Sequence, residues 1–201
     1  MVGVPRMALP HTGKSDCIAV ANTEGRTMKR QVIGFIFVAV CLHAMSGCQT
    51  EASKHFGSGN AKFKSEDYRG AVADFTKVIE LNPNDLRLAR AYCNRGNARG
   101  ALGDYSGAIE DVTKSLSLQP GDFASYAIRG YARTMAEPKD YQGAIADFTK
   151  VIELKPDYAF AFKNRGVAYL HIGKKDKALA DFARAIELGV SISQETLDQC
   201  K

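Results

Sequence analysis

The segment of the chain that most directly suggests chemistry is residues 8–15, which read ALPHTGKS. Apart from Ala in place of the first Gly, it fits the phosphate-binding loop, in which backbone N–H groups and a Lys hold the phosphates of a nucleotide. Such a loop needs a β-strand before it and a helix whose N-terminus faces the phosphates after it. Residues 1–7 are too few for that strand and contain Pro5, and residues 16–27 lack helical spacing of apolar residues. We therefore interpret the match as accidental.

The four histidines do not form a catalytic or metal-binding group. His11 and His43 lie within the first 47 residues, and His55 and His171 stand near opposite ends of the remaining chain. Neither the HExxH pattern of zinc enzymes nor the GxSxG pattern of serine hydrolases occurs. Four acids recur at regular intervals, and we interpret them as a solvated helix face rather than as acid–base pairs: Asp74, Asp111, Asp147 and Asp181. The sequence therefore predicts a non-enzymatic protein, with no catalytic residue, no metal site and no cofactor.

Composition places the chain among globular proteins. Of its 201 residues, 45% are hydrophobic and 24% are charged, and eight Tyr and ten Phe residues supply aromatic side chains for a core. These values argue against global disorder. The formal net charge is +5, of which +3 belongs to residues 1–50. A nucleic-acid-binding domain needs a basic stripe, so the nearly balanced remainder predicts no nucleic-acid partner.

An apolar segment near the N-terminus indicates an export signal. Residues 28–48 read MKRQVIGFIFVAVCLHAMSGC, in which a short positive head precedes an apolar run over residues 32–45. A helix of that run extends about 21 Å, which is too short to cross a hydrocarbon core of about 30 Å comfortably. The positive head, apolar middle and small residues at the end are typical of a secretory signal. An uncleaved signal anchor is the alternative.

The end of this segment, Met45-Ser46-Gly47-Cys48, resembles the lipobox of bacterial lipoproteins, with Met where Leu is usual. The resemblance implies cleavage before Cys48 and lipidation of Cys48. Because Gln49 rather than the retention residue Asp follows the cysteine, it also implies an outer-membrane location facing the periplasm of the bacterial cell envelope.

These features divide the N-terminal part of the chain into three segments. A Met at position 28, directly before the positive head, indicates that translation starts there, so we interpret residues 1–27 as a non-native extension. Residues 28–47 would then be the lipoprotein signal peptide, and residues 48–51 an anchor and linker.

The remaining chain contains four copies of one segment. Residues 67–85 read DYRGAVADFTKVIELNPND and residues 140–158 read DYQGAIADFTKVIELKPDY, and residues 104–122 and 174–190 align with both. One Ala marks each copy and one Gly marks a segment that precedes it: Ala71, Ala108, Ala144 and Ala178, and Gly59, Gly96, Gly130 and Gly166. The Ala residues are 37, 36 and 34 positions apart. A period in the mid-thirties predicts a helical repeat array.

Each half of the repeat unit has helical periodicity. The apolar residues of the first copy recur with a period of 3.6 residues: Tyr68, Ala71, Phe75, Val78 and Ile79. An Asp precedes three of these helices, where it can cap free N–H groups, and a Pro ends them: Asp67, Asp104 and Asp140, and Pro83, Pro120 and Pro156. We interpret the Gly and Ala residues as structural anchors, with each Gly of a first helix facing the small Ala of the second so that the helices pack closely.

This pattern resembles the tetratricopeptide repeat (TPR), which has an aromatic residue at position 4, Gly at 8, Ala at 20 and Pro at 32. The resemblance implies an all-α fold, a right-handed solenoid of four antiparallel helix pairs over residues 52–190, plus a short C-terminal helical segment. The four units are residues 52–85, 89–122, 123–158 and 159–190. Residues 191–201 are short for a full cap, so an apolar end left exposed there would need a partner or self-association.

By the same resemblance, the first helices of successive units line a concave groove that binds a partner polypeptide. The candidate groove residues are Phe56, Asn60, Phe63, Arg90, Asn94, Asn97, Tyr131, Phe160, Lys163 and Asn164. Asn side chains can pair with a peptide backbone, and the aromatic side chains can hold apolar groups. The clamp by which some TPR domains hold a chaperone's C-terminal carboxylate is not predicted, since only Asn60 and Asn94 match its five positions.

The cysteines that follow Cys48 are expected to be structural. We expect Cys93 to be buried and Cys200 to be mobile near the chain end, without a disulfide between them, because an extended array holds them apart.

Together these features predict a lipid-anchored adaptor that binds a protein or peptide in the groove and contacts the membrane through its N-terminal lipid. The second helices carry recurring charges that we interpret as a solvated convex face: Lys77, Glu80, Lys114, Lys150 and Glu153. The alternative is an accessory substrate-binding subunit of a cell-envelope enzyme complex.

Overall fold

The computed structural model describes residues 50–82 and 86–200, and every regular element within these ranges is a helix. The extension 1–27, the proposed signal peptide 28–47 and the proposed lipidation site Cys48 lie outside the described residues. The chain is helical over residues 50–64. The following helices are α2 (Tyr68–Leu81), α3 (Leu86–Ala101), α4 (Tyr105–Leu118), α5 (Phe123–Met135), α6 (Tyr141–Leu154), α7 (Ala159–His171), α8 (Lys175–Glu187) and α9 (Gln194–Asp198).

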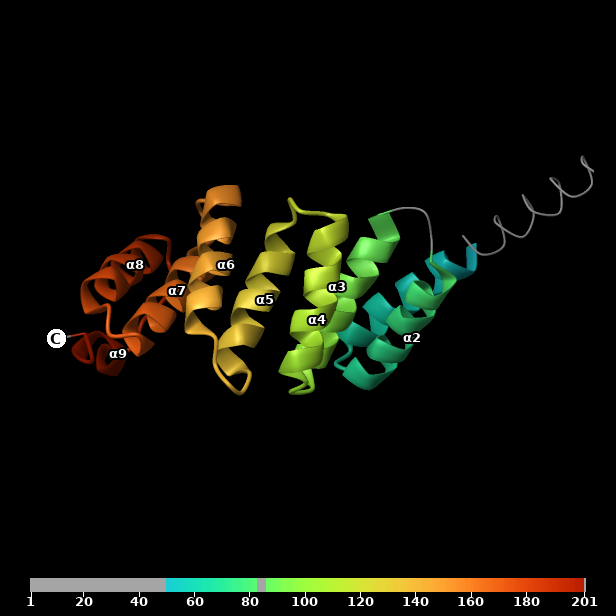
Figure 1. The fold of residues 1–201 in the computed structure, drawn as a ribbon, viewed down its shortest axis with the longest axis horizontal. Helices are drawn as coiled ribbons and strands as arrows, with labels where there is room; N and C mark the ends of the chain where they lie inside the picture. The colour runs from blue at the N-terminus through green and yellow to red at the C-terminus, as the bar shows by residue number, and fades with distance from the viewer. Residues whose placement is uncertain (1–49, 83–85, 201) are drawn as a thin grey trace, which may run out of the picture. The chain divides into compact units, whose positions relative to one another are not determined.

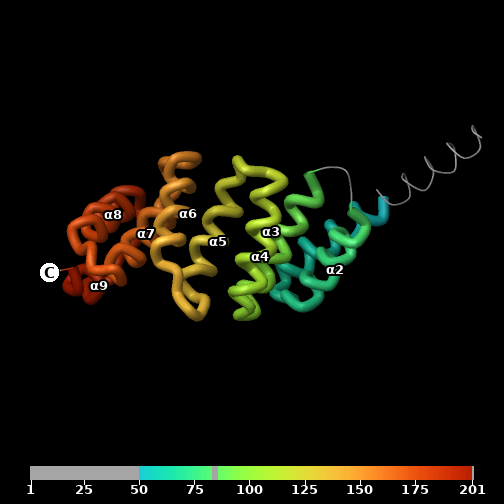
Figure 2. Tube along the Cα trace, viewed as in Figure 1, coloured from blue at the N-terminus to red at the C-terminus, as the bar shows by residue number. Residues whose placement is uncertain are grey.

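The helices pack in chain order. Each helix from α2 to α7 contacts the next one along the chain, and α3 also contacts α5, as α5 contacts α7 (Figure 1). The chain trace runs along one helix and returns along the next through a short turn (Figure 2). The prediction of an all-α solenoid of helix pairs is therefore confirmed.

Three helices begin with the predicted aspartate caps. The side chains of Asp67, Asp104 and Asp140 accept hydrogen bonds from the backbone N–H groups of Gly70, Gly107 and Gly143. A Cβ atom at each of these glycines would collide with the capping carboxylate. The recurring Asp-Tyr-x-Gly sequence is thus explained by capping, because the carboxylate lies where a larger residue would place its side chain.

The second helix of each pair buries the repeated Ala and a bulky apolar residue four positions later. Ala144 and Phe148, for example, are 0% and 1% exposed. In contrast to the expectation, the Gly on the first helix lies against this bulky residue, and only at Gly96 is an atom of the Ala, the carbonyl oxygen of Ala108, also among the nearest. A Cβ on Gly166 would lie 2.6 Å from the ring of Phe182, and the same crowding occurs at Gly59, Gly96 and Gly130. Glycine therefore lets an aromatic or Val side chain fill the space between paired helices.

The recurring acids are buried, so their interpretation as a solvated face is wrong. Asp74, Asp111, Asp147 and Asp181 are between 3% and 8% exposed. Three of them bind an arginine of the preceding helix through both carboxylate oxygens, in the pairs Arg95–Asp111, Arg129–Asp147 and Arg165–Asp181, at 2.7–3.0 Å. A buried carboxylate needs such a partner because desolvation without one costs several kcal/mol.

The first unit has no arginine at the corresponding position and uses three smaller groups instead. Lys62 forms an ion pair with Asp74 at 2.7 Å, His55 Nδ1 lies 2.9 Å from Asp74 Oδ1, and Ser58 donates to Asp74 at 2.6 Å. Burial alone would raise the pKa of Asp74, but these hydrogen bonds outweigh it and lower the pKa to about 2. His55 is thus a partly buried partner of Asp74 between the two helices of the first unit.

The C-terminal segment covers part of the last helix pair. Cys200 is 4% exposed and packs with Ala178 and Phe182, and Ile192 and Leu197 pack beside it. The expectation of a mobile Cys200 is wrong, because the turn after α9 returns this side chain to the core. Cys93 is buried as expected, and burial raises the pKa of its thiol to about 11. Neither cysteine forms a disulfide.

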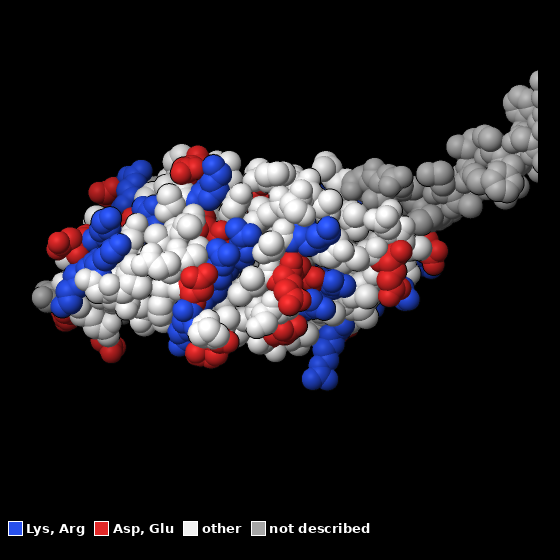
Figure 3. Space-filling model, in the orientation of Figure 1, with Lys and Arg blue, Asp and Glu red and all other residues white. Residues whose placement is uncertain are grey.

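On the face shown in Figure 3, Lys and Arg side chains alternate with Asp and Glu rather than forming one basic stripe. Exposed ion pairs join residues three positions apart within α2, between Lys77 and Glu80, and within α6, between Lys150 and Glu153. Among the helices within residues 50–82 and 86–200, none has the length and apolar character needed to cross a membrane.

Candidate binding surface along the first helices

The first helix of each unit contributes side chains to one continuous surface. Helix 50–64 is joined to α3 by a hydrogen bond in which Asn94 Nδ2 donates to Asn60 Oδ1 at 2.9 Å. Contacts between α3 and α5, and between α5 and α7, continue the row. Residues that are 34 positions apart in sequence, such as Asn60 and Asn94, therefore become neighbours.

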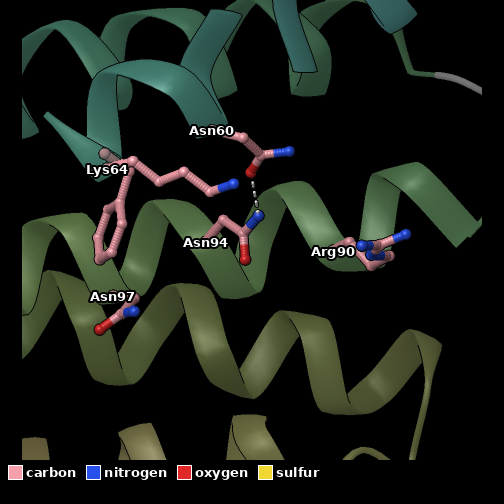
Figure 4. Close-up of a pocket in the computed structure, with 6 residues that line it drawn as sticks. Asn60, Lys64, Arg90, Asn94 and Asn97 are labelled. Atoms are coloured by element: carbon pink, nitrogen blue, oxygen red, sulfur yellow. Dashed lines mark hydrogen bonds between the residues drawn. The ribbon is translucent and has the colours of Figure 1, made fainter. Parts of the chain in front are cut away.

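A cavity of about 260 Å³ opens between helix 50–64 and α3. Figure 4 shows its polar lining, with Lys64 directed toward the Asn60–Asn94 pair and Arg90 on the other side of that pair. The lining residues are Asn60, Phe63, Lys64, Arg90, Asn94 and Asn97. The guanidinium of Arg90 lies 5.3 Å from the centre of the Phe56 ring, a cation–π distance. This cavity therefore combines amides with two cations.

A second cavity, of about 620 Å³, continues the surface toward α7. Phe63 and Asn97 line both cavities, so the two adjoin. Seven of the fifteen residues that line the second cavity are aromatic: Phe63, Tyr68, Tyr105, Tyr131, Phe148, Tyr158 and Phe160. Tyr131 is 49% exposed and Phe160 is 53% exposed. Large apolar side chains left open to solvent next to a concave surface are typical of a protein-binding site.

The structure places eight of the ten candidate groove residues at these cavities. Asn60, Phe63, Arg90, Asn94 and Asn97 line the first, and Tyr131, Phe160 and Asn164 line the second with Phe63 and Asn97. The other two line neither cavity. Phe56 packs edge-to-face on Phe75 in the core between helix 50–64 and α2, and Lys163 precedes Asn164 on α7.

Sequence reasoning missed several lining residues. Lys64 lies at the end of the first helix, and Tyr68 and Tyr105 are the first residues of α2 and α4. Both tyrosines directly follow a capping aspartate, so the recurring Asp-Tyr pair is the signal that could have identified them. Ala108, expected to be only a structural anchor, also lines the second cavity.

The surface contains no arrangement suited to metal binding. Across the two described ranges, no group of three or more His, Cys, Asp or Glu side chains is placed to hold an ion. The surface instead offers amide donors and acceptors, two cations and an aromatic hollow.

Comparison with known proteins agrees with this fold. Sequence models of the tetratricopeptide repeat match residues 55–85, 89–122 and 159–188. No curated protein matches the chain significantly. Among solved structures, the TPR domain of Arabidopsis OM64 is 30% identical over 60% of this chain and 95% of that domain, with a TM-score of 0.55. The MamA protein is 26% identical over 69% of this chain and 73% of MamA, with a TM-score of 0.62.

A third similar structure is the second TPR domain of human RPAP3, determined in complex with the HSP70 peptide SGPTIEEVD. It is 26% identical over 60% of this chain and 97% of that domain, with a TM-score of 0.55. The helix pairs, the repeat spacing and these matches place the chain in a class of helical repeat proteins that support protein–protein interaction. This chain belongs to the tetratricopeptide repeat family.

Proposed function

We propose that this protein is a non-enzymatic adaptor that binds a partner polypeptide along its first helices. The observation that carries the proposal is the pair of adjoining cavities, which together run from helix 50–64 to α7 and share Phe63 and Asn97. Asn side chains can pair with the partner's backbone, and the aromatic hollow can bury its apolar side chains. The peptide held by the similar RPAP3 domain supports a peptide as the kind of ligand.

We further propose that the adaptor is attached to the bacterial outer membrane through a lipid on Cys48, facing the periplasm. The positive head at Lys29 and Arg30, the apolar run 32–45 and the Ser46-Gly47-Cys48 ending support this part of the proposal. Thr50, two residues after Cys48, is already helical. A lipid on Cys48 would therefore hold the array close to the bilayer, and the partner would be met near the membrane surface.

Site-specific photo-cross-linking in bacteria tests the proposal. A photoreactive amino acid at Asn97 or Tyr131 reports on the cavities, and the same group at Lys114, an exposed position of α4, is the matched control. We expect one polypeptide to be captured from both cavity positions and not from Lys114, and mass spectrometry then identifies it. An envelope enzyme captured in this way would favour the accessory-subunit alternative. Capture from Lys114 alone would contradict binding along the first helices.

A further inference from the structure

The charges at the two cavities all have one sign. Lys64 and Arg90 line the first cavity, and neither cavity is lined by an Asp or Glu. Within residues 50–82 and 86–200, no ion pair joins Lys64 or Arg90 to a carboxylate. Both side chains are exposed, so their charges are available to a partner.

The contrast with neighbouring cations on the same helices is informative. Lys62, two residues before Lys64, binds Asp74, and Arg95, five residues after Arg90, binds Asp111. The paired cations face the core between helices, whereas Lys64 and Arg90 face the cavity. Figure 4 shows them on opposite sides of the Asn60–Asn94 pair, and two separated cations favour two carboxylates over one.

The adjoining cavity is lined mainly by aromatic and aliphatic side chains and by no charged one. Tyr131 and Phe160 are exposed beside a hollow formed by further aromatic side chains and by Ala101, Ala127 and Ile128. Because Phe63 and Asn97 border both cavities, a ligand that fills one reaches the other within a short stretch of chain.

We propose that the partner binds through one short segment in which two acidic side chains stand next to a large apolar side chain. The acidic side chains contact Lys64 and Arg90 at the end formed by helix 50–64 and α3. The apolar side chain enters the aromatic hollow between α5 and α7, beside Tyr131 and Phe160. This assignment rests on the proposed function and adds to it the chemistry of the bound segment and the cavity that each of its side chains occupies.

Peptide selection tests this assignment. The full chain, purified in a mild detergent, is used to select binders from a random twelve-residue peptide library displayed on phage. The same selection uses Lys64→Gln with Arg90→Gln, and Tyr131→Ala with Phe160→Ala. The matched control, Lys114→Gln with Lys175→Gln, instead removes two positive charges from the second helices. Circular dichroism verifies the helix content of each variant, and Lys64→Gln alone, an exposed substitution, repeats the test if the double variant loses helicity.

We expect the unmodified protein and the Lys114/Lys175 control to enrich peptides with paired acids beside a large apolar residue. The Lys64/Arg90 variant should enrich apolar residues without acids, and the Tyr131/Phe160 variant should lose the apolar preference. In fluorescence anisotropy, the best selected peptide should bind the Lys64/Arg90 variant about tenfold more weakly, a loss of about 1.4 kcal/mol. Its affinity for the control should change less than threefold.

Two contrary results have different meanings. Peptides that depend on Tyr131 and Phe160 but carry no acid preference, or that bind the Lys64/Arg90 variant and the control equally, would overturn this inference and leave the proposed function standing. Selected peptides that bind both cavity variants as tightly as the unmodified protein would overturn both, because neither cavity would then be the binding site.

Discussion

Arg165 of α7 and Asp181 of α8 form a two-point ion pair, in which Nε donates to Oδ2 and Nη2 donates to Oδ1, each at 2.8 Å. The remaining nitrogen, Nη1, donates to Thr149 of α6 at 3.0 Å. One guanidinium thus joins the two helices of its own unit to the second helix of the unit before it. Arg95 and Arg129 make the same contacts, with Thr76 and Thr113. These contacts fix how successive units stack, and so how the first helices line up.

Removing Arg165 should therefore strongly destabilise the array. Arg165→Ala leaves Asp181 buried without its partner, and we expect the free energy of unfolding to fall by about 3 kcal/mol. The matched control is Arg184→Ala, since Arg184 pairs with Glu187 on the exposed face of α8, and it should cost at most about 0.5 kcal/mol. Urea denaturation followed by circular dichroism measures both. Equal losses for the two variants would contradict the role given to the buried pair.

Acid should weaken the first unit through Asp74. Its pKa in the fold is about 2, against 3.8 ordinarily, so the charged form is stabilised on folding. A depressed folded-state pKa contributes stability that is fully present above about pH 4 and is lost as the pH falls toward 2. The shift corresponds to about 2 kcal/mol.

The measurement for Asp74 is a comparison of the unfolding free energy of the unmodified protein and of Asp74→Asn across this pH range. The variant should be less stable near neutral pH, and the difference should shrink between pH 4 and pH 2. A difference that stays constant down to pH 2 would show that Asp74 gains nothing from its charge.

The glycines that face bulky residues should not tolerate even a methyl group. Gly166→Ala would place a Cβ 2.6 Å from the buried Phe182 ring, and we expect a loss of about 1–3 kcal/mol from overpacking. Gly57→Ala, in helix 50–64, has open space around the new Cβ and should instead gain up to about 1 kcal/mol from helix propensity. Thermal or urea denaturation should therefore move in opposite directions for these two identical substitutions.

Lipidation of Cys48 is tested by metabolic labelling in bacteria with a clickable palmitate analogue. The unmodified protein should carry the label and sediment with membranes. Cys48→Ser should lose both properties, because acyl chains contribute about 0.8 kcal/mol per buried CH₂ to membrane binding. Cys41→Ser changes the cysteine within the proposed signal peptide and should leave labelling intact. An unlabelled wild-type protein would exclude this anchor.

The helices and their caps could be predicted from the sequence because the responsible signals are local. The stripe through Ala71 and Phe75 repeats every 3.6 residues, and Asp67 lies directly before the helix whose Gly70 N–H it caps. The fixed repeat period also predicted that the helices pack in chain order, since each unit must bury the same face against its neighbour.

The ion pairs were misread because their signal is distant and depends on turn length. Within α8, Asp181 looks like one more polar residue, and its partner Arg165 lies 16 positions earlier on another helix. The Arg95–Asp111 pair has the same separation of 16, whereas Arg129 and Asp147 are 18 apart. The turn between α5 and α6, residues 136–140, is two residues longer than the turn between α3 and α4, residues 102–104. The sequence feature that could have revealed these ion pairs is an Arg followed 16 to 18 positions later by an Asp in three successive units.

The candidate site was only partly predictable for the same reason. The family resemblance implied residues of the first helices, such as Asn94 and Tyr131, and the structure places both at the cavities. Tyr68 and Tyr105 begin the second helices and reach the hollow only because the helix pairs stack side by side. Conversely, Phe56 has the expected position in its repeat, but it packs on Phe75 in the core.

The central claim is that the partner binds along the first helices and not on the convex second helices. Isothermal titration calorimetry with the partner identified by cross-linking tests it directly. Asn94→Ala combined with Asn97→Ala, and separately Tyr131→Ala, should each weaken binding by about 1–2 kcal/mol without loss of helicity. Lys77→Ala and Lys150→Ala, which remove exposed charges of α2 and α6, should leave the affinity unchanged. Lost affinity in the two Lys variants, with normal binding by the Asn94/Asn97 and Tyr131 variants, would contradict this account.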